Sequence, residues 1–148
     1  EKASLNAMRI MLNRMRIMQK IKIKLIKKPR ELKDAFEVRK CVFQKEQGID
    51  EKLDFDGKDN ISDHMVAYCD GNPIGTTRVR YLDDKIAKIE RTSVVQNYRD
   101  RGIGNQIMKY TLDFLKEKGT EEVFLNAQEH AKHFHEKLGF KQEGDVFK

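Results

Sequence analysis

Cysteine is scarce in this sequence, with two residues among 148, and tryptophan is absent. Cys41 and Cys69 form no C-x-x-C motif and lack the spacing of metal ligands, which argues against a disulfide framework or a thiolate metal site. Neither lies in a context that would activate a nucleophilic thiol. We expect both to be reduced thiols within the core.

Long apolar runs are also missing. The N-terminus lacks the uninterrupted apolar stretch and the small-residue cleavage site of a secretory signal, and nothing along the chain is apolar for long enough to span a membrane. Hydrophobic residues make up 39% and charged residues 36% of the sequence, a composition typical of a soluble globular protein. We therefore expect a cytoplasmic protein with one main domain, since 148 residues suffice to form a hydrophobic core without disulfide bonds or structural metal ions.

The net charge of +6 is concentrated at the N-terminus. Residues 1–28 carry nine basic and one acidic residue, or +8, and the remaining 120 carry 21 basic and 23 acidic residues, or −2. Because the body is nearly neutral, we expect no nucleic-acid-binding face on it. Residues 1–20 are interpreted as a basic extension or an artificial leader, with a basic amphipathic helix that touches membrane or RNA as the alternative, and residues 21–148 as the domain.

Apolar periodicity and turn residues predict the order of elements. The expected elements are a strand at 21–27, a helix at 31–48, an acidic loop at 49–63, strands at 64–70, 72–83 and 85–95, a helix at 102–118, a strand at 121–127, a helix at 131–139 and a strand at 140–147. Asp70-Gly71 marks a hairpin, and Ile103, Ile107, Tyr110 and Phe114 mark the apolar side of the second long helix. This order predicts an α/β (α+β) fold, a mixed and largely antiparallel twisted sheet with helices on both faces.

The segment YRDRGIGNQIM at 98–108 places two glycines between a strand and a helix. Backbone N–H groups at a helix start lack intrahelical partners, and Gly102 and Gly104 let an anion approach them closely. Arg99 and Arg101 would add positive charge, and Asp100 is expected to turn to solvent. A Rossmann loop is excluded by the missing third glycine and a Walker loop by the missing GK[ST], while an ordinary turn stays open.

Several segments in order resemble the GNAT superfamily of acetyl-CoA-dependent N-acetyltransferases. Arg99-x-x-Gly102-x-Gly104 is followed by Ala131-x-x-Phe134-His135-x-x-x-Gly139-Phe140, and the likeness covers most of 21–148. The segments VRKCVFQKEQG, KIERTSVV and LNAQ are similar to the small YjcF/ElaA-like branch of that family.

The resemblance implies a site for acetyl-CoA as cosubstrate. The loop would hold the CoA pyrophosphate through Arg99, Asp100, Arg101, Gly102, Ile103, Gly104 and Asn105. The pantetheine arm would lie against the backbone of Thr92, Ser93 and Val94, as an added strand does. Gln128 matches a position that contacts CoA in the family, and no metal is implied.

The resemblance also implies direct attack of a primary amine, on a small molecule or a protein, on the thioester. Glu90 is the predicted general base, although a surface glutamate is the alternative, and Arg91 would orient the strand or pair with a carboxylate. His135 stands where the family usually has a tyrosine general acid. His130, His133 and His135 are too unevenly spaced on one helix for a metal site.

The acceptor side is less defined. The sequence ends one strand after the last helix, whereas the family continues, so the acceptor pocket is expected to be incomplete or to be completed by a second subunit of a homodimer. An acidic set either attracts a cationic amine or forms a solvated loop: Glu46, Asp50, Glu51, Asp54 and Asp56. A CoA-binding module without catalysis, with a regulatory or interaction role, is the alternative function.

Overall fold

A single twisted sheet organises the computed structural model, which describes the backbone of residues 2–125, 142–143 and 146–147 and the side chains of 4–16 and 20–125. The seven described strands have the spatial order β1-β2-β3-β4-β5-β7-β6. They are β1 (Ile21–Leu25), β2 (Asp63–Cys69), β3 (Asn72–Tyr81), β4 (Ile86–Val94), β5 (Glu122–Leu125), β6 (Gln142–Glu143) and β7 (Val146–Phe147).

Strands β1 to β4 form an antiparallel meander, and β5 then pairs parallel with β4. The β2–β3 hairpin turns at Asp70 and Gly71, whose φ angles of 50° and 82° suit the tight turn that the sequence predicts. The mixed, largely antiparallel sheet is confirmed. The strand predicted over 140–147 is corrected to the two short antiparallel strands β6 and β7.

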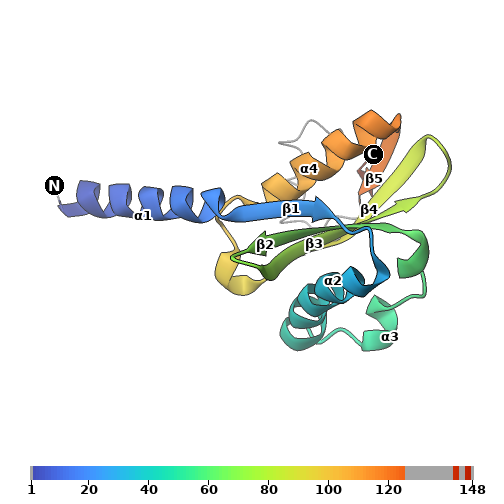
Figure 1. Cartoon of the computed structure of the whole chain (residues 1–148), viewed down its shortest axis with the longest axis horizontal. Coiled ribbons are helices and arrows are strands. Elements are labelled where there is room, and N and C mark those ends of the chain that lie inside the picture. Colours follow the sequence, from blue (N-terminus) through green and yellow to red (C-terminus); the bar gives the residue numbers. More distant parts are fainter. Residues whose placement is uncertain (1, 126–141, 144–145, 148) are drawn as a thin grey trace.

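Helices cover both faces of the sheet (Figure 1). On one face lie α2 (Leu32–Arg39), the π-helix η2 (Lys40–Glu46) and α3 (Glu51–Asp54), and on the other lies α4 (Ile103–Lys118). Short 3-10 turns complete the set: η1 (Pro29–Glu31), η3 (Asp59–Ile61) and η4 (Gln96–Tyr98). The helix predicted over 131–139 lies outside the described residues.

Two local expectations are corrected on the α2 face. The helix predicted over 31–48 is α-helical only to Arg39 and then widens into η2. The last turn of η2 includes an i to i−5 bond from the Gln47 N–H to the Val42 carbonyl. Val42 is the buried residue of η2 and Cys41 is exposed, so only Cys69 is a core thiol. The predicted loop contains α3, because the Asp50 side chain caps it by accepting from the Lys52 N–H at 2.9 Å.

Helix α4 packs its apolar side on the sheet and is confirmed with its predicted bounds and glycine stop. The buried residues of α4 include Ile103, Ile107, Met108, Leu112 and Leu115, which contact core residues of β2 to β5. Tyr110 was expected in this face but is exposed, and its hydroxyl accepts from the Leu25 N–H at 3.3 Å. The apolar face is therefore rotated toward Met108 and Leu112.

Gly75 on β3 allows α4 to approach the sheet. A Cβ at this position would lie 2.6 Å from the Ile107 Cδ1 atom and 3.3 Å from the Ser93 carbonyl oxygen. We expect Gly75→Ala to lower the free energy of unfolding, measured by urea denaturation, by about 1–3 kcal/mol through overpacking. Ile107→Val removes the Cδ1 atom, so the double variant should recover part of this loss. Strictly additive losses in the two variants would contradict the proposed clash.

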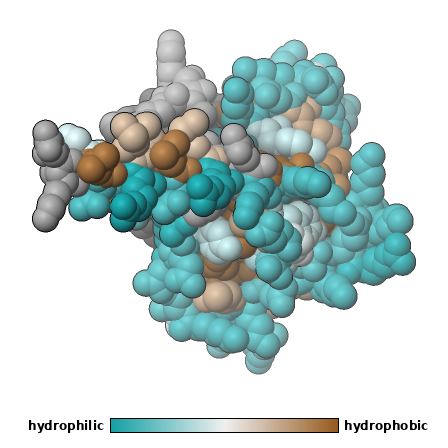
Figure 2. All heavy atoms as spheres, turned by 60° about the vertical axis from the view of Figure 1, so that its left-hand side comes forward, coloured by the Kyte–Doolittle hydropathy of each residue, from teal (hydrophilic) through white to brown (hydrophobic). Residues whose placement is uncertain are grey.

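Helix α1 (Lys2–Gln19) projects away from the sheet (Figure 1). Figure 2 shows its apolar side chains exposed beside its basic ones. Met8, Leu12 and Met15 are each about half exposed. The segment is thus helical, while its origin and its predicted contact with membrane or RNA stay predictions. None of the helices described here is both long and apolar enough to cross a membrane.

Candidate functional site

The parallel pairing of β4 with β5 is described for the first half of β4. It runs from Ile86 opposite Glu122 to Ile89 opposite Leu125, the last residue described in this part of the chain. On its other side β4 stays paired with β3 as far as Val94. Among the described strands, none pairs with residues 90–94 on the β5 side, and this segment of β4 is called the open edge. N–H and C=O groups on such an edge are of the kind that accept an added strand. Thr92, Ser93 and Val94 lie in this segment, and their contact with a pantetheine arm stays a prediction.

A β-bulge begins this open edge. Thr76 pairs with Ser93 and Arg78 with Glu90, so Thr77 alone faces Arg91 and Thr92. Arg91 has a φ of 56°, an unusual value for a residue with a Cβ. A bulge bends its strand and locally disrupts regular pairing, here between β3 and β4. No sequence signal marked the bulge.

Arg91 is tied to the loop that holds α3. Its Nη2 atom donates to the Leu53 carbonyl at 3.1 Å and lies 3.3 Å from Asp56 Oδ2, and its Nε atom lies 3.4 Å from Asp54 Oδ1. The prediction that Arg91 pairs with a carboxylate is confirmed. These contacts hold the strained residue of the bulge in place.

The glycine loop connects the open edge to α4. Gly102 is the residue that precedes the helix, with a φ of 80° and no side-chain cap. The first helical bond runs from the Gln106 N–H to the Gly102 carbonyl at 3.1 Å, so the N–H groups of Ile103, Gly104 and Asn105 have no partner within the helix. Those groups and the helix dipole favour an anion, as the sequence predicts.

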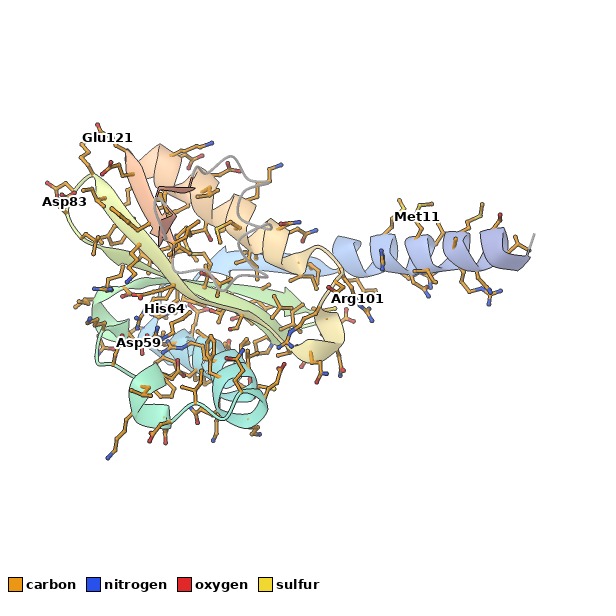
Figure 3. All side chains as sticks on the ribbon, turned by 180° about the vertical axis from the view of Figure 1, so that it is seen from behind. Met11, Asp59, His64, Asp83, Arg101 and Glu121 are labelled. Carbon is orange, nitrogen blue, oxygen red and sulfur yellow. The ribbon has the colours of Figure 1, made fainter. Side chains whose placement is uncertain are left out.

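The charged side chains of this loop differ in their partners. Asp100 is exposed, as expected. Arg101 lies at the start of α4 (Figure 3), with its guanidinium 5.9 Å from the Tyr98 ring centroid and no carboxylate partner among the described residues. Arg99 instead donates from Nε to the Val94 carbonyl at 2.8 Å and pairs with Glu46, which raises the pKa of Arg99. Its side chain therefore joins β4 to η2, and Arg101 is left as the positive side chain of the loop.

Two buried polar atoms at this end have no hydrogen-bond partner among the described residues. They are Ser93 Oγ on the open edge of β4 and Asn105 Oδ1 in the first turn of α4. A buried polar atom without a partner is costly, so each is suited to a polar ligand that lies along β4 and reaches the helix start. An extended amide chain ending in a diphosphate has this pattern of groups, and the site fits CoA on these grounds.

Glu90 is buried at the start of the open edge, between two guanidinium groups. Its Oε1 atom accepts from Arg78 Nη2 at 2.9 Å and from Arg80 Nε at 2.7 Å. Burial raises the pKa of Glu90, but the hydrogen bond from Arg80 and the charge of Arg78 outweigh it, and the net pKa is lowered. Glu90 is thus ionised at neutral pH and is a weak base.

The same network continues beneath the α3 loop. Arg78 also bonds to Asp56 at 2.8 Å and Asp59 at 3.0 Å, and Arg39 bonds to Asp59 at 2.6 Å and pairs with Asp54 at 3.1 Å. Arg39 and Arg78 are fully buried. Sequence analysis missed this network, although the Arg-x-Arg pattern on β3 was a signal that two cations share one face of a strand.

The acidic set of the sequence divides into two parts. Asp54, Asp56 and Glu46 pair with arginines from distant elements, which neutralise their charges within the fold. Asp50 and Glu51 are exposed at the start of α3, where Asp50 caps the helix. The solvated-loop interpretation therefore holds for part of the set, and attraction of a cationic acceptor stays a prediction.

His64 lies next to Asp59 between the sheet and the α2 side (Figure 3). Its Nε2 atom is 3.0 Å from the Asp59 carbonyl oxygen, and its buried Nδ1 atom has no hydrogen-bond partner among the described residues. Burial lowers the pKa of His64, so the ring is neutral at pH 7 and adds no charge to the network.

Gln128, His130, His133 and His135 lie outside the described residues, so their predicted roles stay predictions. Within the portion that is described, no group of three or more His, Cys, Asp or Glu side chains is arranged to hold a metal ion. The expectation that the protein binds no metal is not tested at His130, His133 and His135, because these residues lie outside the described part.

Comparisons with known proteins agree with this geometry. Residues 30–140 match the model of the Acetyltransferase (GNAT) family. The chain is 36% identical over 121 residues to YjcF of Bacillus subtilis (strain 168), named as an uncharacterised N-acetyltransferase, and the match covers 82% of this chain and 86% of YjcF. The chain therefore belongs to the GNAT acetyltransferase family and is an acyltransferase, which confirms the resemblance.

Solved structures share the fold. Escherichia coli ElaA superposes with a TM-score of 0.73 at 22% identity, over 86% of this chain and 96% of ElaA. A GNAT family acetyltransferase from Elizabethkingia anophelis, solved with acetyl-CoA bound, superposes with a TM-score of 0.67 at 17% identity, over 84% of this chain and 78% of that chain.

Proposed function

We propose that the protein transfers an acetyl group from acetyl-CoA to a primary amine of a small molecule or a protein. The observation that carries this proposal is the end of β4, where the buried Ser93 Oγ has no hydrogen-bond partner among the described residues, followed by the uncapped N-terminus of α4. The acetyl-CoA bound to the Elizabethkingia relative supports the choice of cosubstrate.

In this proposal, the N–H groups of Ile103, Gly104 and Asn105 bind the diphosphate, with Arg101 adding positive charge. The backbone at 92–94 binds the pantetheine amides, and Ser93 Oγ and Asn105 Oδ1 gain partners. Acetyl-CoA supplies the activated acetyl group: the carbonyl–sulfur bond breaks, a carbonyl–nitrogen bond forms, and the proton lost by the amine ends on the CoA sulfur.

Glu90 is the proposed catalytic carboxylate, at the start of the open edge. Its lowered pKa means that it does not keep a proton at neutral pH. We infer that it stabilises the positive charge that develops on the amine nitrogen and directs a water that removes the proton. His135 stays the predicted donor of a proton to the departing sulfur.

A second candidate is a CoA-binding protein without transfer activity. One observation favours it, namely that Arg78 and Arg80 already neutralise Glu90. Release of free thiol across a panel of amines separates the two functions. Tight CoA binding without thiol release for any amine would favour the second.

Calorimetry with acetyl-CoA tests the binding site. We expect Gly102→Val to weaken binding about tenfold, because a left-handed backbone costs a residue with a Cβ about 1–2 kcal/mol, and relieving that strain would move the loop N–H groups. Gly119→Val is the matched control, because Gly119 ends the same helix at a φ of 91°. The affinity of Gly119→Val for acetyl-CoA should stay within about twofold of the affinity of the unchanged protein.

The comparison isolates the cofactor site from general damage to α4. Equal losses of affinity in the two variants would assign the effect to helix stability. Absence of any acetyl-CoA binding by the unchanged protein would remove the case for the cofactor site.

A further inference from the structure

Two cations beside Glu90 remain accessible to solvent. Arg80 on β3 and Lys88 on β4 are directly opposite in the sheet register, and their side chains are 20% and 23% exposed. Residues two apart on a strand share a face, so both lie on the face of Arg78 and Glu90. Lys88 and Glu90 flank Ile89, the last residue of β4 paired with β5, so this pair of cations lies next to the start of the open edge.

These two cations have more donors than the nearby carboxylate can satisfy. Arg80 uses only Nε for Glu90, and its two Nη groups have no hydrogen-bond partner among the described residues. The Lys88 Nζ atom lies 3.8 Å from Glu90 Oε2, which is beyond a normal hydrogen bond. Glu90 is also shared with Arg78. The site can therefore take a further acceptor of hydrogen bonds.

The charge balance of the network indicates the sign and the magnitude of the charge that this ligand group should carry. Among the described residues, the network contains five cations, Arg39, Arg78, Arg80, Lys88 and Arg91, and four carboxylates, Asp54, Asp56, Asp59 and Glu90. These charges sum to one positive charge in excess. Arg80, Lys88 and Arg91 are all partly exposed, but Arg91 is bonded to the α3 loop, so the donors left for a ligand are those of Arg80 and Lys88. One carboxylate would balance the network, whereas a second ammonium group would be repelled.

We propose that the acceptor is an amine that also carries a carboxylate, and that Arg80 and Lys88 bind this carboxylate while the amine lies toward Glu90. This inference rests on the proposed function. A guanidinium forms paired hydrogen bonds with a carboxylate, and Lys88 adds a point charge. Polyamines and amines without an anionic group are then poor acceptors.

Transfer assays with matched acceptors test this subsite. Three pairs differ only by the carboxylate: lysine and cadaverine, arginine and agmatine, and tyrosine and tyramine. Thiol release gives kcat/KM for each, with acetyl-CoA saturating. We expect the carboxylated member of at least one pair to be preferred about tenfold or more, as for a charge-assisted pair.

Two variants separate the carboxylate contact from the intrinsic reactivity of each amine, because the ratio within a pair is compared between proteins. Lys88→Gln keeps both hydrogen bonds of Glu90, and we expect it to reduce the preference about fivefold or more; Arg80→Gln should reduce it as well. Lys22→Gln, on the exposed side of β1, is the control and should leave the preference unchanged. Acetyl-CoA affinity should stay unchanged in all three.

The possible results are distinct. A preference that is lost in Lys88→Gln and kept in Lys22→Gln supports the subsite. Thiol release that is indifferent to the carboxylate, or a preference that survives both Lys88→Gln and Arg80→Gln, overturns the subsite and leaves the proposed function standing. Acetyl-CoA binding without thiol release for any of the six amines or for the wider amine panel overturns the proposed function and the subsite together.

Discussion

Arg39→Met should lower the free energy of unfolding by about 3–5 kcal/mol, the usual cost of removing one partner from a buried ion pair. Arg39 is fully buried and binds both Asp54 and Asp59, which are themselves buried. Methionine fills much of the volume but donates no hydrogen bond. The two carboxylates would stay in the interior without their main partner, and that penalty is what denaturant titration should measure.

Arg30→Met is the matched control, because Arg30 is exposed and has no ion-pair partner among the described residues. A substitution of that kind usually changes stability by less than about 0.5 kcal/mol. If Arg39→Met also changed stability by less than about 1 kcal/mol, the network could not be what holds the α3 loop against the sheet.

Glu90→Gln should lower kcat/KM for the amine by about 100-fold. This factor is the low end of the rate contribution usually made by a group that assists proton transfer. The affinity for acetyl-CoA should change little, because the loop N–H groups and the β4 backbone are kept. Steady-state kinetics with calorimetry separates the two effects. Retained turnover in Glu90→Gln would show that Glu90 has only a structural role.

The same variant tests the pH dependence of stability. Because the folded pKa of Glu90 is lowered, its ionised form stabilises the fold above the unfolded pKa, which is the ordinary glutamate value near 4.5. This contribution is lost as the pH falls from that value through the folded pKa. Glu90→Gln should therefore show a shallower loss of stability below about pH 4.5 than the unchanged protein. Glu51→Gln, at an exposed position of α3, is the control variant.

Periodicity in the sequence was sufficient for the elements that depend on neighbouring residues. The β2–β3 hairpin follows from Asp70-Gly71, and the bounds of α4 follow from its spacing and from Gly119. The anion-binding character of the helix start was equally local, since it depends on two glycines and on N–H groups that any helix leaves without partners. These features needed no knowledge of the rest of the fold.

The roles of charged side chains could not be obtained in this way. The sequence predicted Arg99 in the cofactor loop and left two interpretations of the acidic set open, but it gave no sign that Arg99 bonds to Glu46 or Asp54 to Arg39. Charges interact over distances that are set by packing, and a residue pattern holds no information on which arginine reaches which carboxylate. The π-helix η2 and the β-bulge at Arg91 were also not predicted, because each depends on packing against other elements and not on local residue spacing.

By itself, the sequence determined the strand order along the chain, the helix that begins at the glycine loop and the family, because each depends on local spacing and residue type. Only the tertiary structure decided that a bulge falls at Arg91 of β4 and that Glu90 lies between Arg78 and Arg80. Those features depend on the register of paired strands and on burial, which arise when segments distant in the chain come together.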